Sequence, residues 1–461
     1  MADDLTELPE TPEGDYKLER SVISAVRAAL SEMDTNAIDA ALDPLHPADI
    51  ADLLEQISSG ERRALLGLWS MGIDGEVLSE LDENLREEVI GYLPEGVLSE
   101  AVREMDSDDV VDLVEDLEDH HQERILGALK DVDRVAVELA LSYPEYSAGR
   151  LMQRELVVAP EHWSVGQAID FLRRDDNLPE QFYHIILVDP AYHPTGYVTL
   201  GKLLGSPRAV KLMSIMEDSF RTIPVTQPEE DVAYAFNQYH LISAPVVDED
   251  ERLVGVITID DAMVVLDDEA EEDILRLAGV SGEESLSDRT LETVRQRLPW
   301  LGVNLFTAIL ASIVISQFEA ILAQIVALAV LMPIVASMGG NAGTQSLTVA
   351  VRAIATKDLT GSNVWRVVRR EAFAGLLNGM IFAVVMGVVG LIWFGTPMLA
   401  VVIAVAMVVN MVVAALAGIL IPVGLEKLGV DPALASGAFV TTVTDVVGFF
   451  AFLGLAALLL V

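Results

Sequence analysis

The sequence contains no cysteine among its 461 residues. Disulfides, thiolate nucleophiles and cysteine-ligated zinc or iron–sulfur sites are therefore excluded. Histidine is missing from the C-terminal part, because the seven histidines all lie at or before His240. Any chemistry beyond that residue must rest on other side chains.

Basic residues are scarce as well: 29 Lys and Arg stand against 72 Asp and Glu, for a net charge of −43. The imbalance lies in residues 1–300, because residues 301–461 carry six acidic and six basic residues. A strongly acidic surface disfavours nucleic acid as a partner and favours cations. A host with a salty cytoplasm would favour the same bulk acidity, so only charges at specific spacings bear on function.

The N-terminal stretch of residues 1–17 is acidic and has no apolar core. We predict a disordered tail there rather than a signal peptide. The rest of the acidic region is predicted to be a soluble, multidomain part that precedes an apolar one.

Five apolar stretches of membrane-spanning length follow from Leu298 onward. Each is near or above the roughly 20 residues that a helix needs to cross a bilayer. Buried helices of a large soluble domain are the alternative, but so many consecutive runs favour a membrane domain. The predicted spans are residues 298–318, 321–350, 371–394, 398–424 and 433–460.

Basic residues flank these spans on one side only. They precede the first span and follow the second and the fourth. The positive-inside rule then places the acidic region in the cytoplasm and the C-terminus outside, in a multi-pass protein of the plasma (inner) membrane. The flanking residues are Arg295, Arg297, Arg352, Lys357, Arg366, Arg369, Arg370 and Lys427.

The second span is unusually rich in polar and helix-breaking residues, and reads VLMPIVASMGGNAGTQSLTVAVRA. Irregular backbone survives in a bilayer where it lines a wet cavity or is buried in protein, so we predict a broken helix there. The amides of Asn341 and Gln345 are predicted to face a conduit. The third span adds Glu371 and Asn378, and the fourth adds Asn410. Close helix packing is the simpler explanation of the glycines at positions 375, 379, 387 and 390.

One carboxylate, Asp445, stands alone in the last span, SGAFVTTVTDVVGFFAFLGLAALLLV. Without a basic partner it must be protonated, hydrogen-bonded in a proton relay, or balanced by a cation from outside. Hydroxyl, amide and carbonyl oxygens nearby are hard ligands that suit Mg²⁺, which keeps much of its water. One carboxylate is little charge for a divalent ion, and a two-fold axis would bring two copies together in a homodimer.

Residues 18–140 contain an internal repeat at an offset of 60, with HPADIADLLEQ near 46–56 returning as DSDDVVDLVED at 106–116. We predict a stack of helix pairs. Asp108 and Asp112 share one helix face, a like-charge pair that destabilises the helix unless something positive lies against it. A solvated acidic face is the alternative.

A second repeat lies in residues 151–265, at an offset of 59, with short β-branched strands between helices. ILVDPAYHPTGYVTLGKLL parallels PVVDEDERLVGVITIDDAM, and together the units resemble a tandem pair of cystathionine-β-synthase (CBS) domains. In that family a Gly, Thr and Asp at this spacing bind the ribose of an adenosine ligand. The resemblance therefore implies that ATP or another adenine nucleotide binds Gly255, Thr258 and Asp261, whereas the first unit has Lys202 in place of the aspartate.

A dense acidic run, LDDEAEEDILRLAG, then leads toward the first span. Helix capping explains one or two of these carboxylates. The order of parts closely resembles the MgtE family of magnesium channels and transporters, from about residue 20 onward. The most specific stretches are MGGNAGTQS at 338–346 and TTVTDVVGF at 441–449.

The resemblance implies a multidomain fold. It comprises an all-α helical-repeat N-terminal domain (18–140), α/β tandem CBS domains (141–268), a linking or plug helix (269–297) and a polytopic α-helical membrane domain with five transmembrane helices (298–461). It also implies a homodimeric Mg²⁺ conduit in membrane lipid, closed by cytoplasmic Mg²⁺ at acidic interfaces. The expected ion-pathway residues are Asp445, Thr441, Thr444, Gly448, Asn341 and Gln345, and the expected sensor residues are Asp108, Asp112, Asp260, Asp268, Glu271 and Glu272.

Two other functions remain open: a membrane-anchored, nucleotide-sensing signalling protein, and an ion-coupled divalent cation transporter. An anchor needs neither an intramembrane carboxylate nor a polar second span. An intramembrane enzyme would need a nucleophile and a base, and no such pair is recognisable in the spans. The sequence therefore predicts a transport protein that is not an enzyme.

Overall fold

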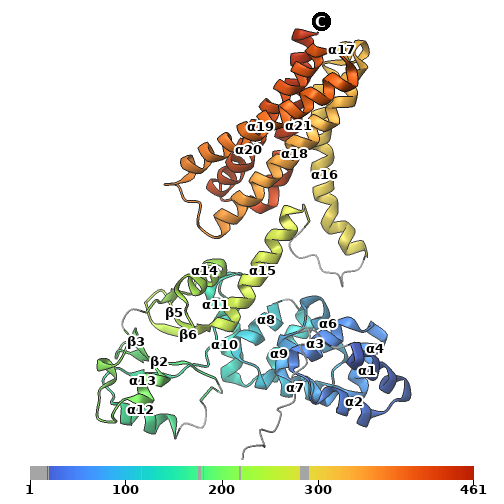
Figure 1. Ribbon diagram of the computed structural model, residues 1–461. Coiled ribbons are helices and arrows are strands. Elements are labelled where there is room, and N and C mark those ends of the chain that lie inside the picture. The colour runs from blue at the N-terminus through green and yellow to red at the C-terminus, as the bar shows by residue number, and fades with distance from the viewer. Residues whose placement is uncertain are drawn as a thin grey trace, which may run out of the picture. The chain divides into compact units, whose positions relative to one another are not determined.

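The computed structural model describes residues 18, 20–115, 117–174, 178–179, 181–217, 220–280 and 290–460 (Figure 1). The predicted acidic tail of residues 1–17 lies outside these described residues. The chain divides into two compact units, Met1–Leu266 and Asp267–Val461, and each is described by itself.

The first unit begins with short helices that pack around one apolar core. Leu53, Leu65 and Leu113 are fully buried in it. The predicted repeat is confirmed, because α3 and α4 correspond to α8 and α9 at the same offset. The helices are α1 (Arg20–Glu32), α2 (Thr35–Leu42), α3 (Pro47–Gln56), α4 (Ser59–Trp69), α5 (Gly75–Ser79), α6 (Glu83–Tyr92), α7 (Glu95–Glu104), α8 (Ser107–Glu115), α9 (Asp119–Ala128) and α10 (Asp131–Ala140), with a short 3₁₀ turn, η1 (Ser70–Gly72), after α4.

Buried arginines tie these helices together. The guanidinium of Arg62 donates to Leu54 O at 2.8 Å and to Ile57 O at 3.2 Å, and it pairs with the Glu88 carboxylate at 2.6 Å. The two carbonyls lie at the end of α3, where helical carbonyls lack partners within their own helix. Arg62 therefore caps one helix while it anchors another.

Replacing Arg62 by Met is expected to lower the free energy of unfolding by about 2–3 kcal/mol, because two buried carbonyls and a carboxylate lose their donor. Thermal unfolding of the purified chain, followed by circular dichroism, measures this. The matched control is Arg63→Met, since Arg63 is exposed on the same helix. Equal melting temperatures for the two variants would show that the guanidinium contacts do not matter.

Two small sheets of the same topology follow, which confirms the tandem CBS pair. In each sheet the first pair of strands is parallel, the second is antiparallel, and a bulge falls at the equivalent position, after Leu187 and after Val246. The elements are α11 (Ala148–Leu151), β1 (Val158–Pro160), α12 (Val165–Leu172), β2 (His184–Val188), β3 (Pro194–Thr199), α13 (Leu200–Gly205), η2 (Leu212–Ser214), β4 (Ile223–Pro224), α14 (Glu229–Tyr239), β5 (Ser243–Val247), β6 (Leu253–Thr258) and α15 (Ile259–Leu277).

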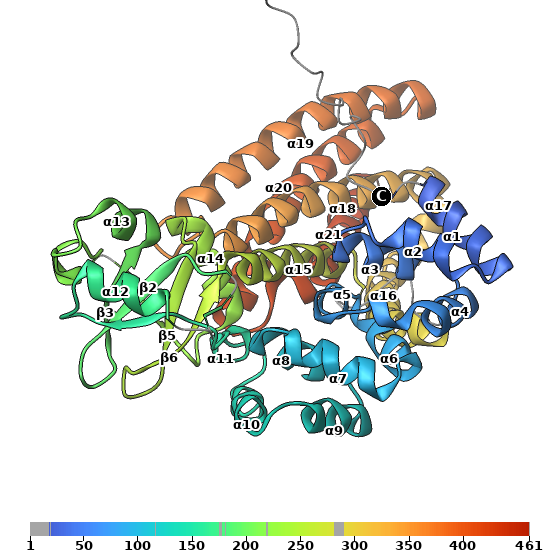
Figure 2. The same cartoon turned by 90° about the horizontal axis from the view of Figure 1, so that it is seen from below.

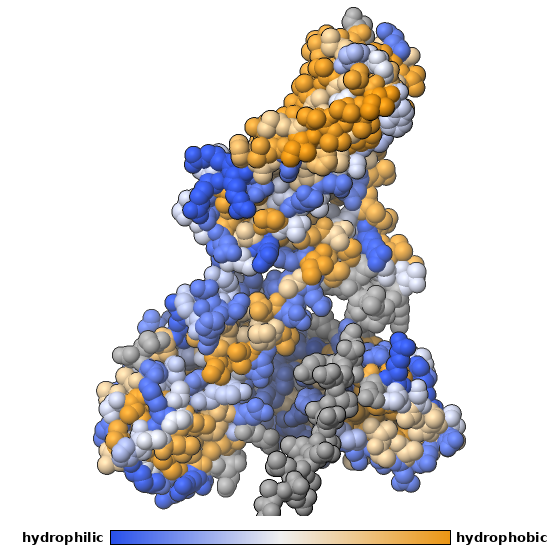
Figure 3. Space-filling model, in the orientation of Figure 1, coloured by the Kyte–Doolittle hydropathy of each residue, from blue (hydrophilic) through white to orange (hydrophobic). Residues whose placement is uncertain are grey.

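The second unit is a bundle of long apolar helices, and five of its helices are long and apolar enough to cross a membrane. Apolar side chains cover much of their visible surface (Figure 3). The central helix α20 packs against α18, α19 and α21. The helices are α16 (Thr290–Ser316), α17 (Glu319–Gln324), α18 (Val326–Ala355), α19 (Val364–Phe394), α20 (Pro397–Lys427) and α21 (Pro432–Leu459).

The predicted break in the second span is wrong, because α18 runs without interruption through Pro333 and the GGNAGTQ cluster. Gly339 and Gly343 of this cluster serve close packing instead, whereas a Cβ atom on Gly340 would meet no atom within 4 Å. A Cβ atom on Gly343 would lie 2.6 Å from Val440 Cγ1, and one on Gly418 would lie 2.6 Å from Gly343 O. The predicted packing role of Gly375 is confirmed, since its Cβ would lie 2.7 Å from the Ala415 Cβ.

Candidate functional site

Asp445 lies in the middle of α21 and is half-buried. Among the described residues, none forms an ion pair with its carboxylate or donates a hydrogen bond to it. The hydroxyl of Thr441, one turn earlier, donates within its own helix, to Gly437 O at 3.0 Å. The structure thus leaves the charge of Asp445 open to a ligand from outside the chain.

Two of the predicted neighbours of the ion, Thr444 and Gly448, are buried. Thr444 is fully buried, and its hydroxyl donates to Thr441 O at 2.9 Å. Gly448 is buried against Asn410, whose Nδ2 would lie 2.9 Å from a Cβ atom at that position. Both residues pack α21 against its neighbours in a single chain, and their place beside the ion stays a prediction.

A polar stripe runs along the exposed face of α18. Its members recur at intervals of three and four residues, which places them on one side of the helix. The hydroxyls of Thr344 and Thr348 donate to carbonyls one turn back, each at 3.0 Å, whereas the amides of Asn341 and Gln345 form no hydrogen bond with any described residue. Polar groups facing hydrocarbon are costly, so water or protein must cover this stripe in a membrane.

Asn410 of α20 is 1% exposed and faces α18 and α21. Its Nδ2 donates to Val335 O of α18 at 2.8 Å, and its Oδ1 has no partner among the described residues. Gly448 of α21 gives this amide its space. Asn410 therefore holds α18, with its polar stripe, beside α21, which carries Asp445. The sequence signal for this role is a lone amide in an apolar span.

A methyl group at Gly448 is expected to disturb this junction. Gly448→Ala should lower the free energy of unfolding by about 1–3 kcal/mol, because a buried side chain with no room to move must shift. The melting temperature of the purified chain measures the change. Gly424→Ala is the control, since nothing lies within 4 Å of a Cβ there, and an unchanged melting temperature for Gly448→Ala would contradict the packing.

In the first unit, α8 packs against α11 and lies near the start of α15 (Figure 2). Asp108 and Asp109 thereby interact electrostatically with Asp261, and we call these three residues the acidic cluster. No three carboxylates of the described residues are grouped so that they could hold a metal ion together. Burial, reinforced by the charge of Asp261, raises the pKa of Asp108 well above its usual range. The same causes, in the same order, raise the pKa of Asp109 to about 7, and burial raises that of Asp261 to about 6.

Of the predicted sensor residues, Asp108 belongs to the acidic cluster, whereas Asp112 and Asp260 have partners of their own. Asp112 does not face Asp108 unbalanced, because its carboxylate pairs with Arg86 at 2.7 Å. Asp260 accepts a hydrogen bond from the Thr258 hydroxyl. Asp109 was not predicted, and only the packing of two domains reveals it.

The C-terminal half of α15 belongs to the second unit, where its acidic residues have different surroundings. Asp268 and Glu271 are exposed. Glu272 pairs with Arg276, which also pairs with Asp431 at the start of α21. Leu277 packs beside the buried Val440 of the same membrane helix. This helix end is therefore fixed to the helix that carries Asp445.

The predicted nucleotide residues lie together at the end of β6. The Thr258 hydroxyl donates to the Asp261 carboxylate at 2.7 Å, and a Cβ atom on Gly255 would lie 2.8 Å from Gln153 O. In the first CBS repeat, Lys202 stands in place of the aspartate and pairs with Glu217. The second CBS repeat keeps its aspartate, Asp261, which also belongs to the acidic cluster, and the first CBS repeat lacks one at this position.

Comparisons with known proteins cover the same parts. A family model described as a divalent cation transporter matches residues 332–455, the MgtE intracellular N domain matches 45–146, and the CBS domain matches 212–268.

The chain is 33% identical to the magnesium transporter MgtE of Thermus thermophilus, over 96% of this chain and 99% of that protein. It is 30% identical to the magnesium transporter MgtE of Bacillus subtilis, over 90% of this chain and 92% of that one. A crystal structure of the cytosolic domain of the Mg²⁺ channel MgtE in complex with ATP aligns with 53% of this chain and 99% of its own, with 31% identity and a TM-score of 0.49. The relatives are named as transporters, not enzymes, and the chain belongs to the MgtE family of magnesium transporters.

Proposed function

We propose that two copies of the chain form a Mg²⁺ conduit in the plasma membrane, with Asp445 of each copy beside the ion. The observation that carries this is the open carboxylate of Asp445 in an otherwise uncharged helix, next to α18 with its exposed polar stripe. A single chain leaves the amides of Asn341 and Gln345 uncovered, and a second copy or a water-filled conduit would cover them.

The chemistry of the ion fits this arrangement. Mg²⁺ prefers oxygen ligands and gives up its water reluctantly, so a pathway lined by one carboxylate and several amides would hold it through retained water. Two copies of Asp445 about an axis would supply two negative charges to balance the ion. Passage of a hydrated ion needs no group that binds it tightly.

The proposed orientation has the acidic region in the cytoplasm. Arg352 lies in the last turn of α18, Lys427 ends α20, and Arg366 lies in the first turn of α19. All three belong to the end of the bundle where Arg276 pairs with Asp431. The short helix α17 and the C-terminal end of α21 lie at the opposite end (Figure 1). The positive-inside rule assigns the first of these ends to the cytoplasm.

The acidic cluster is the proposed regulatory site. Carboxylates whose pKa values are raised by burial and mutual repulsion are poised to exchange protons for a divalent cation. Mg²⁺ attracted to Asp108, Asp109 and Asp261 would offset their repulsion and favour the packing of α8 against the CBS pair. α15 starts at this cluster and ends beside α21, which gives the bound ion a route to the conduit.

An adenine nucleotide such as ATP is proposed to bind at the junction of β6 and α15. The Gly255, Thr258 and Asp261 spacing is retained there, and Asp261 would accept from the ribose hydroxyls. Because the same carboxylate belongs to the acidic cluster, the nucleotide and Mg²⁺ would influence each other's binding.

Uptake of Mg²⁺ into proteoliposomes that contain the purified chain tests the proposed function. We expect flux down a Mg²⁺ gradient, with no need for an imposed Na⁺ or H⁺ gradient, because a hydrated-ion conduit is passive. Flux that appears only with such a gradient would favour the ion-coupled transporter. Absence of flux in either case would favour the membrane-anchored signalling protein.

A further inference from the structure

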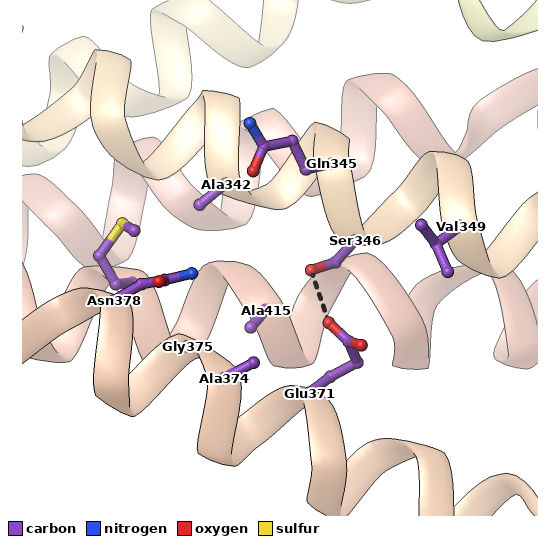
Figure 4. Close-up of a pocket in the computed structure, with 10 residues that line it drawn as sticks. Ala342, Gln345, Ser346, Val349, Glu371, Ala374, Gly375, Asn378 and Ala415 are labelled. Carbon is purple, nitrogen blue, oxygen red and sulfur yellow. Dashed lines mark hydrogen bonds between the residues drawn. The ribbon is translucent and has the colours of Figure 1, made fainter.

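A cavity of about 180 Å³ lies between α18, α19 and α20 (Figure 4), and Asp445 is not among the residues that line it. We call it the Glu371 pocket. Gln345 and Ser346 of α18 line one side, and Glu371 and Asn378 of α19 line the other. Gly375 lets the helices approach here, since a Cβ atom at that position would lie 2.9 Å from Met411 O of α20.

Glu371, like Asp445, is a carboxylate within a membrane-spanning helix that forms no ion pair with a described basic residue. The buried hydroxyl of Ser346 donates to it at 3.3 Å, and no described Lys or Arg forms an ion pair with it. The nearby Arg369 directs its Nε to Trp365 O of its own helix, at 3.2 Å. Glu371 is half-buried, and a carboxylate in a membrane-spanning helix is stabilised by a proton or by a cation from outside.

The rest of the lining favours a cation over a proton. A protonated carboxyl needs one or two hydrogen-bond partners, and Ser346 already supplies one. The pocket also holds two side-chain amides, Gln345 and Asn378, which form no hydrogen bond with any described residue. Asn378 lies two turns along α19 on the face of Glu371. The three side chains stand apart in Figure 4, and rotation of the two amides toward the carboxylate would place their oxygens around one ion.

The charge of the site decides between kinds of cation. One carboxylate balances one positive charge, whereas a divalent ion would leave an uncompensated charge in a medium of low dielectric constant. Mg²⁺ also demands near-octahedral geometry and retains its water, and Na⁺ or K⁺ accepts a less regular set of oxygens. We propose that the Glu371 pocket binds one alkali-metal cation, held by Glu371 with the amide oxygens of Gln345 and Asn378.

This site goes beyond the proposed conduit, and binding in it does not depend on Mg²⁺ conduction. Gln345 belongs both to the Glu371 pocket and to the polar stripe of α18. An ion that orients this amide would therefore alter the lining of the conduit, which makes the alkali-metal cation a modulator of flux.

Equilibrium binding of radioactive sodium to the full chain in nanodiscs, without Mg²⁺ and with choline chloride to hold the ionic strength, tests the proposal. We expect saturable binding that potassium competes for, and a loss of at least about tenfold in affinity for E371Q, because the charge is removed. N378A should weaken binding to a smaller extent. E426Q, which removes an exposed carboxylate at the end of α20, should bind as the wild type does.

Equal sodium binding by E371Q and the wild type, or no saturable binding by the wild type, would overturn the proposal. Binding of Mg²⁺ but not sodium that depends on Glu371 would make the pocket a divalent site and overturn it too. If E371Q does not fold, the folded variants E371D and N378A must show the weakened binding. Retained sodium binding in D445N separates this site from the conduit.

Discussion

Replacement of Asp445 by Asn is expected to reduce Mg²⁺ flux into proteoliposomes by at least about 100-fold. The substitution keeps the size of the side chain and removes the charge. Two unit charges about 4 Å apart interact by about 4 kcal/mol at an effective dielectric constant near 20, and a tenfold change corresponds to about 1.4 kcal/mol. An estimate of 100-fold therefore allows for water between the carboxylate and the ion.

The melting temperature of this variant should equal or exceed that of the wild type. Asp445 has no described partner that would lose a contact, and a half-buried carboxylate without a partner destabilises the chain. Asp358→Asn is the matched control, since it removes one exposed carboxylate from the link before α19 and should leave flux unchanged. Normal flux in the Asp445→Asn variant would show that the carboxylate does not serve the ion.

The membrane helices illustrate what sequence periodicity and length can and cannot predict. The five spans could be predicted from the apolar runs alone, because each run is long enough to cross a bilayer and a soluble domain does not contain five such runs in succession. The predicted break in α18 failed because glycine is compatible with two outcomes, an irregular backbone or close packing, and the choice depends on what lies opposite. Val440 and Ala414 of the neighbouring helices lie opposite Gly343, and they are far from it in sequence.

The candidate site shows the same division. Asp445 could be predicted because a carboxylate among apolar residues is conspicuous by itself. The packing contacts of Thr444, Gly448 and Asn410 could not be predicted, since each contact depends on which face of one helix meets another. Asn410 fits Gly448 through contact across helices, and no spacing within either segment encodes that contact.

The negative charge of the acidic region could be predicted from the sequence, but the partners of individual carboxylates could not. Repeats revealed the helix pairs and the CBS units, because each unit buries its own apolar face. The repulsion expected between Asp108 and Asp112 is relieved by Arg86, 26 residues from Asp112 along the chain. Asp109 meets Asp261 only when α8 packs on the CBS pair, and this tertiary contact creates the acidic cluster.

The acidic cluster is expected to make the chain less stable as the pH rises in the absence of Mg²⁺. The pKa of Asp109 is raised to about 7 and that of Asp261 to about 6, chiefly by burial. A carboxyl group whose pKa is higher in the folded state stabilises it fully below its ordinary pKa of about 4, and this contribution is lost as the pH rises through the folded value. In EDTA, the melting temperature should therefore fall by about 5 °C between about pH 5 and 8.

Asp109→Asn should remove much of this fall, because its amide stays neutral over the whole range. At pH 8 without Mg²⁺ the variant should melt at a higher temperature than the wild type. Asp133→Asn, which changes an exposed residue of α10, is the control and should follow the wild type. An identical pH dependence in all three proteins would show that the cluster does not titrate as described.

Mg²⁺ should reverse the loss of stability, and the size of its effect should depend on pH. Protons and the cation compete for the same carboxylates, so millimolar Mg²⁺ is expected to raise the melting temperature of the wild type more at pH 8 than at pH 6. Asp109→Asn should respond less at both pH values, since the cluster then offers the ion one charge fewer. Sodium chloride at the same ionic strength is the test of bulk screening. If it stabilises the wild type as much as Mg²⁺ does, the carboxylates form a salt-adapted surface and the regulatory site does not exist.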